Sequence, residues 1–476
     1  MKYQRNKTED FSNKNIITNQ VVEINNNSPN ENKRQSKEPI STYNFIHNIM
    51  FLGLDASFLI TIKIPHLIGI ILHILFIFII GAANTWSYYM ISIIYEKKKE
   101  KDEETNNNYN LWNKIFKIQF FGKLLKTMLF IILSVYSIGE IIIHQILIYN
   151  SLGGIINILG GYNYELVSQF LLHSFFGENK YKYIINYFIS LFILFPACLF
   201  YLNINYKQLN ILSIIGVNII LFIVIAIIFQ FPFYLINFLD EEKDNIKEII
   251  FNNKKKEISI LHFLRSIGIL FFYFSGHNGL IQVIKEVNIE NKENKEERIK
   301  KYKCLFIKSN IYNCLIYLLI SICGYLTMPD GGVDIITERK IFWSKDIIMT
   351  MIRLLLIPIS ISKIIINLNI FKEKFISFFN ISLFEYKKEI LLMIIILIIT
   401  SFISSLYQNI VSYITVIGGL ITIPAFFIPP FLYKHYYNLE TKNCKFLWSL
   451  LICGILLCAL GLISSIFAII AICNGE

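Results

Sequence analysis

Residues 272–279 read Phe-Tyr-Phe-Ser-Gly-His-Asn-Gly, and they lie inside an otherwise apolar run from Leu261 to Ile284. That run has the length of about 20 residues that a helix needs to cross a bilayer. Gly276 and Gly279 bracket a histidine and an asparagine, and glycine loosens a helix because it has no side chain to restrict its backbone. The sequence therefore predicts a membrane-spanning helix that is interrupted near its centre.

Further apolar runs of similar length occur along the whole chain. They are Phe45–Ile64, Leu67–Tyr95, Leu124–Tyr149, Tyr183–Tyr201, Ile211–Phe233, Ile307–Met328, Ile347–Ile370, Ile390–Tyr407, Ile410–Tyr433 and Phe446–Cys473. Of the 476 residues, 54% are hydrophobic and only 17% are charged, which excludes a water-soluble protein. We predict an all-α polytopic membrane protein with about 11 transmembrane helices in residues 44–476.

The charged residues indicate the topology of the chain. Residues 1–43 are rich in Asn, Lys, Ser and Glu, so we expect a disordered tail. Most Lys and Arg lie in the tail and in the connections on its side of the membrane, which predicts a cytoplasmic N-terminus. The net charge of +11 therefore reflects topology, and no basic face for a nucleic acid is expected. We expect the protein in the plasma membrane or in a vacuolar or lysosome-like membrane.

The first apolar run contains a second candidate break, Gly53-Leu54-Asp55-Ala56-Ser57. It falls in the first helix, five helices before the break at Gly276, so the two breaks occupy corresponding positions in two five-helix halves. In transporters, paired breaks of this kind expose backbone donors and acceptors to a substrate at the membrane midplane. The alternatives are a hydrogen-bonded core aspartate and a small-residue packing face with a structural histidine. The candidate substrate-binding residues are Gly53, Asp55, Ala56, Ser57, Phe274, Ser275, Gly276, His277 and Asn278.

Two more ionisable residues lie deep in the third run. Glu140 and His144 are four residues apart, so they share one helix face and can relay a proton or form an ion pair. Together with Asp55 they are the candidate ion-coupling residues, because charged groups at bilayer depth are costly. A buried pair that only orders the bundle is the alternative.

The runs contain further charged and aromatic residues. Arg353 and Lys363 lie about two turns from the ends of their run, so we expect both side chains to extend to the membrane surface. Phe271, Phe272 and Phe274 are candidates for closing over a substrate, with lipid-facing packing as the commoner role. No spacing suggests a metal site or a cofactor.

Four stretches, in order, resemble the amino acid/auxin permease family of eukaryotic amino acid transporters. They are Phe195–Leu199 with Leu209 and Ser213, Phe272–Asn278 with Ile284–Val287, Tyr317–Leu326, and Gly418–Pro424 with Pro429 and Tyr433. The likeness covers about residues 51–470. The first helix departs from it, since Asp55, Ser57 and Ile62 stand where the family usually has two glycines and a proline.

This resemblance implies a LeuT-like fold with a 5+5 inverted repeat and one extra helix. It also implies secondary active transport of amino acids by symport with protons or sodium ions. We expect the substrate to be a neutral or cationic amino acid, and the oligomeric state is open. A membrane-embedded acyl or lipid transferase that uses His277 as its base is the main alternative from another class. A channel is a weaker alternative, because the chain has no charged ring or filter-like repeat.

Overall fold

The described part of the protein is entirely helical. The computed structural model describes residues 42–101, 122–160, 192, 194, 206–241, 260–286, 295–327, 335–338, 347–379, 386–406, 409–437 and 444–473. All of these residues belong to one compact unit, Pro39–Glu476. Residues 1–41, which hold most of the expected tail, lie outside the described residues.

The helices follow the predicted apolar runs closely. They are α1 (Thr42–Gly53), α2 (Ser57–Ile60), α3 (Lys63–Ile68), α4 (Ile70–Lys101), α6 (Gly122–Gly160), α9 (Tyr206–Glu241), α11 (Ile260–Phe272), α12 (His277–Glu286), α13 (Lys295–Thr327), the 3₁₀ turn η1 (Ile336–Glu338), α14 (Ile347–Phe378), α15 (Tyr386–Leu406), α16 (Ile410–Thr422), the π-helical turn η2 (Ile423–Phe427), α17 (Ile428–Tyr437) and α18 (Cys444–Cys473). Within the described ranges, eight of these segments are long and apolar enough to cross a membrane. The run Tyr183–Tyr201 lies outside the described residues apart from Phe192 and Leu194, so the count of 11 stays a prediction.

Two of the predicted runs form broken helices. The first run is divided into α1, α2 and α3, with Leu54 and Asp55 outside any helix. The run from Leu261 to Ile284 is divided into α11 and α12, with residues 273–276 between them. Both interruptions predicted from glycine and small polar residues are therefore present.

The boundary between the first two runs lies later than the sequence suggests. The predicted runs place it at Pro65 and His66, but both residues lie within α3 and the turn is made at Gly69. Gly69 has a φ of 86°, a left-handed conformation that glycine adopts without strain, and its amide donates to the carbonyl of Pro65 over 2.8 Å.

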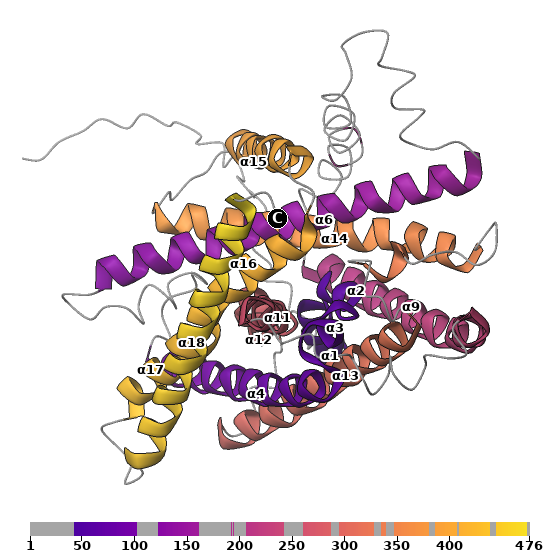
Figure 1. Ribbon diagram of the computed structural model, residues 1–476. Helices are drawn as coiled ribbons and strands as arrows, with labels where there is room; N and C mark the ends of the chain where they lie inside the picture. The colour runs from indigo at the N-terminus through magenta and orange to yellow at the C-terminus, as the bar shows by residue number, and fades with distance from the viewer. Residues whose placement is uncertain are drawn as a thin grey trace, which may run out of the picture. The chain divides into compact units, whose positions relative to one another are not determined.

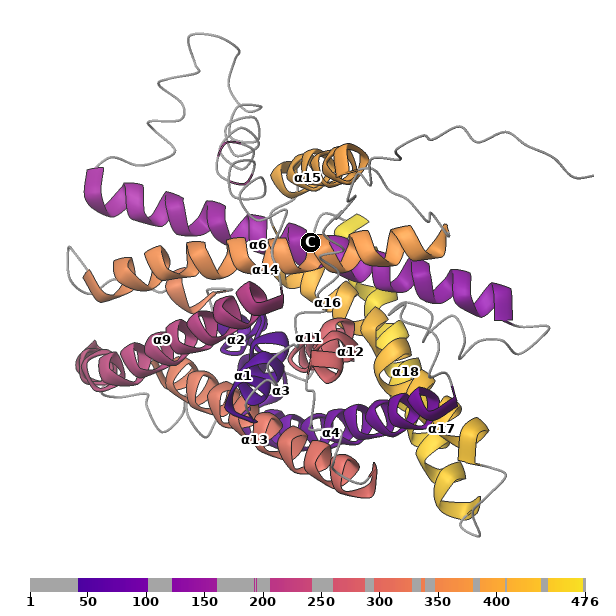
Figure 2. The same cartoon turned by 180° about the vertical axis from the view of Figure 1, so that it is seen from behind.

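The broken helices run in opposite directions between two pairs of long helices. Half-helix α1 contacts α12, while α3 contacts α11. Helices α6 and α14 pack side by side on one side of them, and α4 and α13 pack together on the other (Figures 1 and 2). The residues at both breaks are consequently enclosed by side chains from long, continuous helices.

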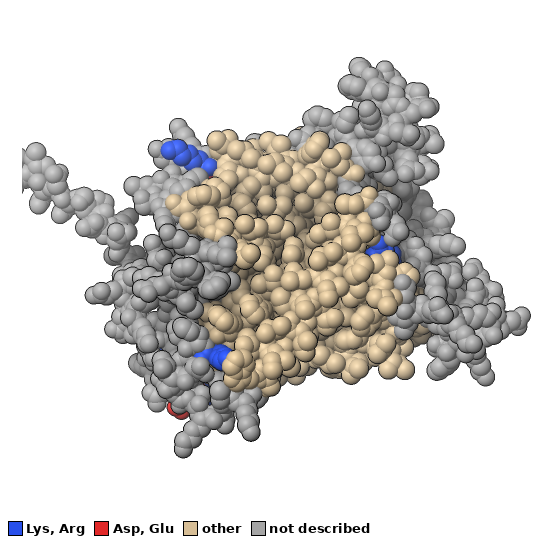
Figure 3. All heavy atoms as spheres, turned by 60° about the vertical axis from the view of Figure 1, so that its left-hand side comes forward, with Lys and Arg blue, Asp and Glu red and all other residues tan. Residues whose placement is uncertain are grey.

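The outer surface of the bundle is apolar. Ile225 and Phe229 on α9 are exposed, as are Ile455 and Leu456 on α18. Figure 3 shows a broad face of the described residues with almost no acidic or basic side chains, and with Lys and Arg only at its edges. Such a large exposed apolar surface fits a lipid environment, because lipid tails can contact apolar side chains without the free-energy cost of exposing them to water.

Candidate functional site

The break between α1 and α2 holds a buried carboxylate. Asp55 is only 1% exposed, and its Oδ1 accepts a hydrogen bond from the amide of Ala56 over 2.7 Å. The chain returns to helix when the amide of Phe58 donates to the carbonyl of Asp55 over 3.0 Å. The Asp55 carboxylate thus accepts a hydrogen bond from a backbone amide that the interrupted helix leaves without a partner.

Glu140 and His144 on helix α6 both interact with Asp55. His144 Nε2 lies 2.6 Å from Asp55 Oδ1. The carboxyl groups of Glu140 and Asp55 also interact, and Asn367 on α14 donates to Glu140 Oε2. The hydrogen bonds found for His144 and Glu140 go to Asp55 in the break and to helix α14, so the two residues connect α6 with the break and with α14.

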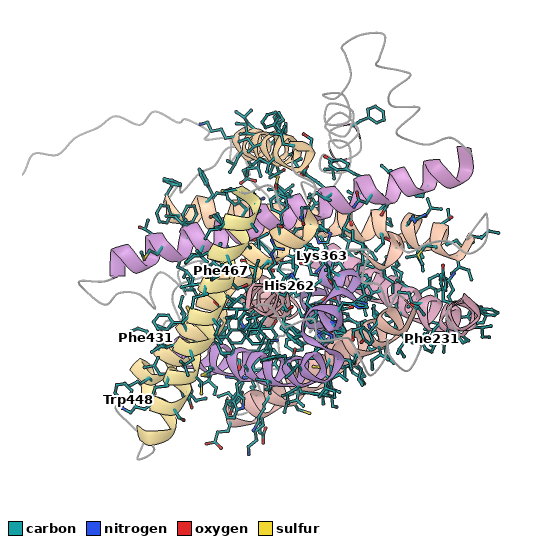
Figure 4. All side chains as sticks on the ribbon, in the orientation of Figure 1. Phe231, His262, Lys363, Phe431, Trp448 and Phe467 are labelled. Atoms are coloured by element: carbon teal, nitrogen blue, oxygen red, sulfur yellow. The ribbon has the colours of Figure 1, made fainter. Side chains whose placement is uncertain are left out.

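Lys363 on α14 completes this charged group, and our expectation that it reaches the membrane surface is wrong. Its side chain is buried and its Nζ donates to the carbonyl of Phe51 over 2.5 Å, near the end of α1. Figure 4 shows Lys363 in the interior, between α14 and the central helices. Arg353 is buried as well, and it donates to the carbonyl of Thr337 in η1 over 2.5 Å.

The break between α11 and α12 contains neutral polar groups. The amide of Ser275 donates to the carbonyl of Phe272 over 3.2 Å, which closes a single turn. The carbonyl of Ser275 accepts from the hydroxyl of Tyr136 on α6 over 3.2 Å. The Ser275 hydroxyl is buried and has no hydrogen-bond partner among the described residues. This break therefore offers a hydroxyl, and no charged group, to a bound molecule.

The two breaks are in direct contact. A Cβ atom added to Gly276 would lie 3.1 Å from Cβ of Leu52 and 3.3 Å from the amide nitrogen of Gly53. It would also lie 2.5 Å from the hydroxyl of Tyr88 on α4. A side chain at this position would therefore push against Tyr88 and crowd the end of α1.

Tyr317 on α13 bridges the same two segments. Its hydroxyl oxygen lies 2.8 Å from the carbonyl oxygen of Gly53, 2.8 Å from that of Tyr273 and 3.0 Å from Ser57 Oγ. Its ring stacks on Tyr273 with a centroid distance of 4.2 Å and an angle of 6°. The hydroxyl has one hydrogen, so it donates to one carbonyl at a time.

The last two candidate residues of the second break point elsewhere. His277 Nε2 lies 2.8 Å from Ser87 Oγ on α4, and its ring packs against Tyr88 at 4.6 Å. Asn278 donates to Ser137 Oγ on α6 over 2.9 Å and accepts from the ammonium of Lys374 on α14. These residues hold α12 against its neighbours, and Asp55 does not contact either of them.

The aromatic residues before the second break are core residues. Phe271, Phe272 and Phe274 are at most 2% exposed, so the lipid-facing alternative is wrong for all three. Phe274 packs edge-on against Tyr317 at 5.8 Å.

Sequence reasoning missed Lys363 and Tyr317 as members of the site. A helical wheel cannot identify Tyr317, because a tyrosine in an apolar helix is usually a packing residue. Lys363 could not be identified either, because its apolar run appears to end two turns later, within reach of the membrane surface.

Antiparallel broken helices that meet in a bundle, with charged side chains at the crossing, define the architecture of a secondary transporter. The chain belongs to the family described as transmembrane amino acid transporter protein, whose family model matches residues 65–473. The match begins after the first break, so Asp55 lies outside it. The comparison with curated protein sequences found no match.

Solved transporter structures resemble this chain in fold. A manganese transporter from Eremococcus coleocola has a TM-score of 0.50 and 10% identity, covering 90% of this chain and 86% of its own. A nucleobase-cation-symport-1 family transporter has a TM-score of 0.49 and 12% identity, covering 92% and 93%. A Na⁺-coupled sialic acid symporter has a TM-score of 0.48 and 12% identity, covering 90% of each chain. The protein is an integral, multi-pass membrane protein with the predicted LeuT-like fold.

Proposed function

We propose that this protein moves amino acids across a membrane by alternating access, with the substrate bound between the two breaks. The observation that carries the proposal is the contact of the breaks at Gly276 and Gly53, beside the buried carboxylate of Asp55. Irregular backbone at membrane depth is tolerated only where it is enclosed by protein or lines a cavity, because lipid offers it no hydrogen bonds. Two such segments in contact are best explained by a ligand site.

The groups at the crossing suit the ammonium group of an amino acid. The carbonyls of Gly53 and Tyr273 end two half-helices, where the helix dipole favours positive charge. Tyr317 donates to only one of them at a time, so the other is available to a substrate N–H donor. We assign Ala56, Ser57, Phe274 and Ser275 to the walls of this site, and a neutral or cationic amino acid as the substrate.

We further propose that transport is coupled to an ion through Asp55, Glu140 and His144. Two interacting carboxyl groups and an imidazole can hold a shared proton, which moves between them as the bundle changes conformation. A relay role for His144 is supported by its 2.6 Å contact with Asp55.

The transferase alternative receives little support from the surroundings of His277. A general base must reach the proton that it removes in a plausible substrate pose. His277 is 5% exposed and lies between Ser87, Tyr88 and Phe426, the last with a ring-centroid distance of 6.1 Å. These contacts suit a structural histidine that positions α12.

Uptake of labelled amino acids tests the transport proposal. The purified protein is reconstituted into vesicles, and uptake is measured with an imposed proton gradient, an imposed sodium gradient or no gradient. We expect an amino acid to accumulate against its concentration gradient when an ion gradient is imposed. Uptake that equals that of protein-free vesicles for all amino acids would contradict the proposal, and acyl transfer in the same vesicles would favour the transferase.

We also propose a cytoplasmic N-terminus on a tail of residues 1–43, followed by a transporter domain of residues 44–476 in the plasma membrane or a vacuolar or lysosome-like membrane. A tag placed before residue 1 should resist protease added to intact cells. It should be cleaved once the plasma membrane is selectively permeabilised. Cleavage in intact cells would contradict this orientation.

A further inference from the structure

Lys363 places its side-chain nitrogen where α1 ends. Its Nζ donates to the carbonyl of Phe51 over 2.5 Å and lies 4.6 Å from the centroid of the Phe51 ring. The residue is 3% exposed, and it sits on the long helix α14, which packs along α6. Its position is therefore fixed by two helices and not by a mobile loop.

The end of α1 is a position that favours a cation. The last carbonyls of a helix have no partner within the helix, and the helix dipole adds negative potential there. In broken-helix transporters, carbonyls of this kind coordinate sodium ions or protons. In this protein, Lys363 Nζ already donates a hydrogen bond to one of these carbonyls, that of Phe51.

The charges around the first break include a second lysine of α14. Lys363 acts electrostatically on both Asp55 and Glu140, and Lys374 acts on Glu140 as well. Two lysine side chains therefore act on the two carboxylates, and the group needs no alkali-metal ion to balance its charge. A buried cluster is stable only when its charges are compensated, because desolvation of an unpaired ion costs several kilocalories per mole.

We propose that Lys363 is a resident cation that takes the place of a sodium ion at the end of α1, so that transport needs no alkali-metal ion there. The inference rests on the proposed transport function, because it names the ion that the site does not use. In this proposal Lys363 is a positioning residue, because its side chain holds α1 and α14 together.

Thermal stability in different salts tests the inference without requiring transport. Unfolding of the detergent-solubilised protein is followed in sodium chloride and in N-methylglucamine chloride at equal ionic strength. A ligand that binds only the folded state raises the melting temperature. We expect the same melting temperature for the wild-type protein in both salts, and a Na⁺-specific rise of about 2 °C or more for Lys363→Met, in which Na⁺ can bind the vacated carbonyl.

Lys374→Met is the matched control, because Lys374 is a second buried lysine of α14 that also acts on Glu140, but its ammonium contacts Asn278 instead of α1. It should show no Na⁺-specific rise. A Na⁺-specific rise in the wild-type protein would overturn the inference even if Lys363→Met fails to fold. A folded Lys363→Met protein that does not respond to sodium would also overturn it.

Uptake separates this inference from the proposed function. Amino acid accumulation driven by a proton gradient should be equal, within about twofold, in sodium and in N-methylglucamine media. Accumulation that depends on sodium contradicts the resident cation but supports transport. Absence of amino acid uptake in both media contradicts the proposed function, and the melting measurements then decide the role of Lys363 alone.

Discussion

The two helix breaks differ in their chemistry. The first contains Asp55, which contacts His144 and interacts electrostatically with Lys363 and Glu140. The second offers the hydroxyl of Ser275 and the close approach at Gly276, with no charged group at its centre. The difference suggests that the first break interacts with charged groups, whereas the second break limits the shape of the substrate that can bind.

This comparison predicts that added volume is most harmful at the second break. Gly276→Leu should abolish uptake while leaving membrane insertion intact, because its side chain would enter the space held by Tyr88, Leu52 and Gly53. Uptake is measured beside surface expression. Gly276→Ala should lose part of the activity, and adding Tyr88→Phe should restore some of it by removing the hydroxyl 2.5 Å from the new Cβ. Normal uptake by Gly276→Leu would exclude a site at this crossing.

Removal of charge should be most harmful at the first break. Asp55→Asn preserves volume but leaves the ammonium of Lys363 with one compensating acid fewer. Breaking a buried ion pair costs about 3–5 kcal/mol, so we expect at least a hundredfold loss of uptake and a lower melting temperature. Asp55→Glu, which keeps the charge, should retain more stability than Asp55→Asn. If Asp55→Asn took up amino acid as fast as the wild type, a charged group at the first break would not be required for transport.

Glu140→Gln separates coupling from substrate movement. The amide keeps a polar contact with Asn367 but cannot carry a proton. Proton-driven accumulation should therefore be lost, while exchange of internal for external amino acid persists because it needs no net proton movement. Loss of both activities would indicate a structural role for Glu140, and retention of both would shift the coupling to Asp55 or to His144.

Tyr317→Phe tests whether the breaks are linked. It keeps the stacking on Tyr273 but removes the hydroxyl that reaches both Gly53 and Tyr273. A buried carbonyl left without its donor costs about 1–3 kcal/mol, so we expect a change of about 5- to 150-fold in kcat/KM for uptake. Tyr302→Phe on the same helix is the control, since its hydroxyl lies 3.5 Å from its acceptor in Ile284. Equal effects of the two variants would argue against a special role for Tyr317.

The smallest effect is expected for Ser275→Ala. Its hydroxyl has no partner among the described residues, so the melting temperature should not fall. KM for uptake should rise modestly, because the hydroxyl is available to the substrate. An unchanged KM would remove Ser275 from the substrate contacts and leave the second break with a purely steric role.

Most of the fold could be predicted from the sequence, because long apolar runs and glycine-rich interruptions have few physical explanations. Gly276 and the stretch around Asp55 mark both breaks correctly. The partners at the breaks could not be predicted, since they come from helices far away in the chain. Lys363 shows why: the apolar run appears to end at Ile370, but α14 continues to Phe378, which leaves Lys363 about four turns from either end and unable to reach water.

Two residues that the sequence singled out have their side chains against other helices. His277 and Asn278 stand in the most conspicuous motif, yet their side chains contact Ser87 on α4 and Ser137 on α6. A motif in one helix shows that the helix is interrupted. It cannot show which side of the helix faces the other break, because that depends on packing.

The central claim, that the two breaks enclose one substrate site, is tested most directly by thiol labelling of Ser275→Cys. The modification rate is measured in reconstituted vesicles, with the parent protein as the control for the native cysteines. We predict that labelling inhibits uptake, and that the transported amino acid slows labelling while an amino acid that is not transported does not. Labelling that leaves uptake unchanged, or that the transported amino acid does not slow, would contradict the claim.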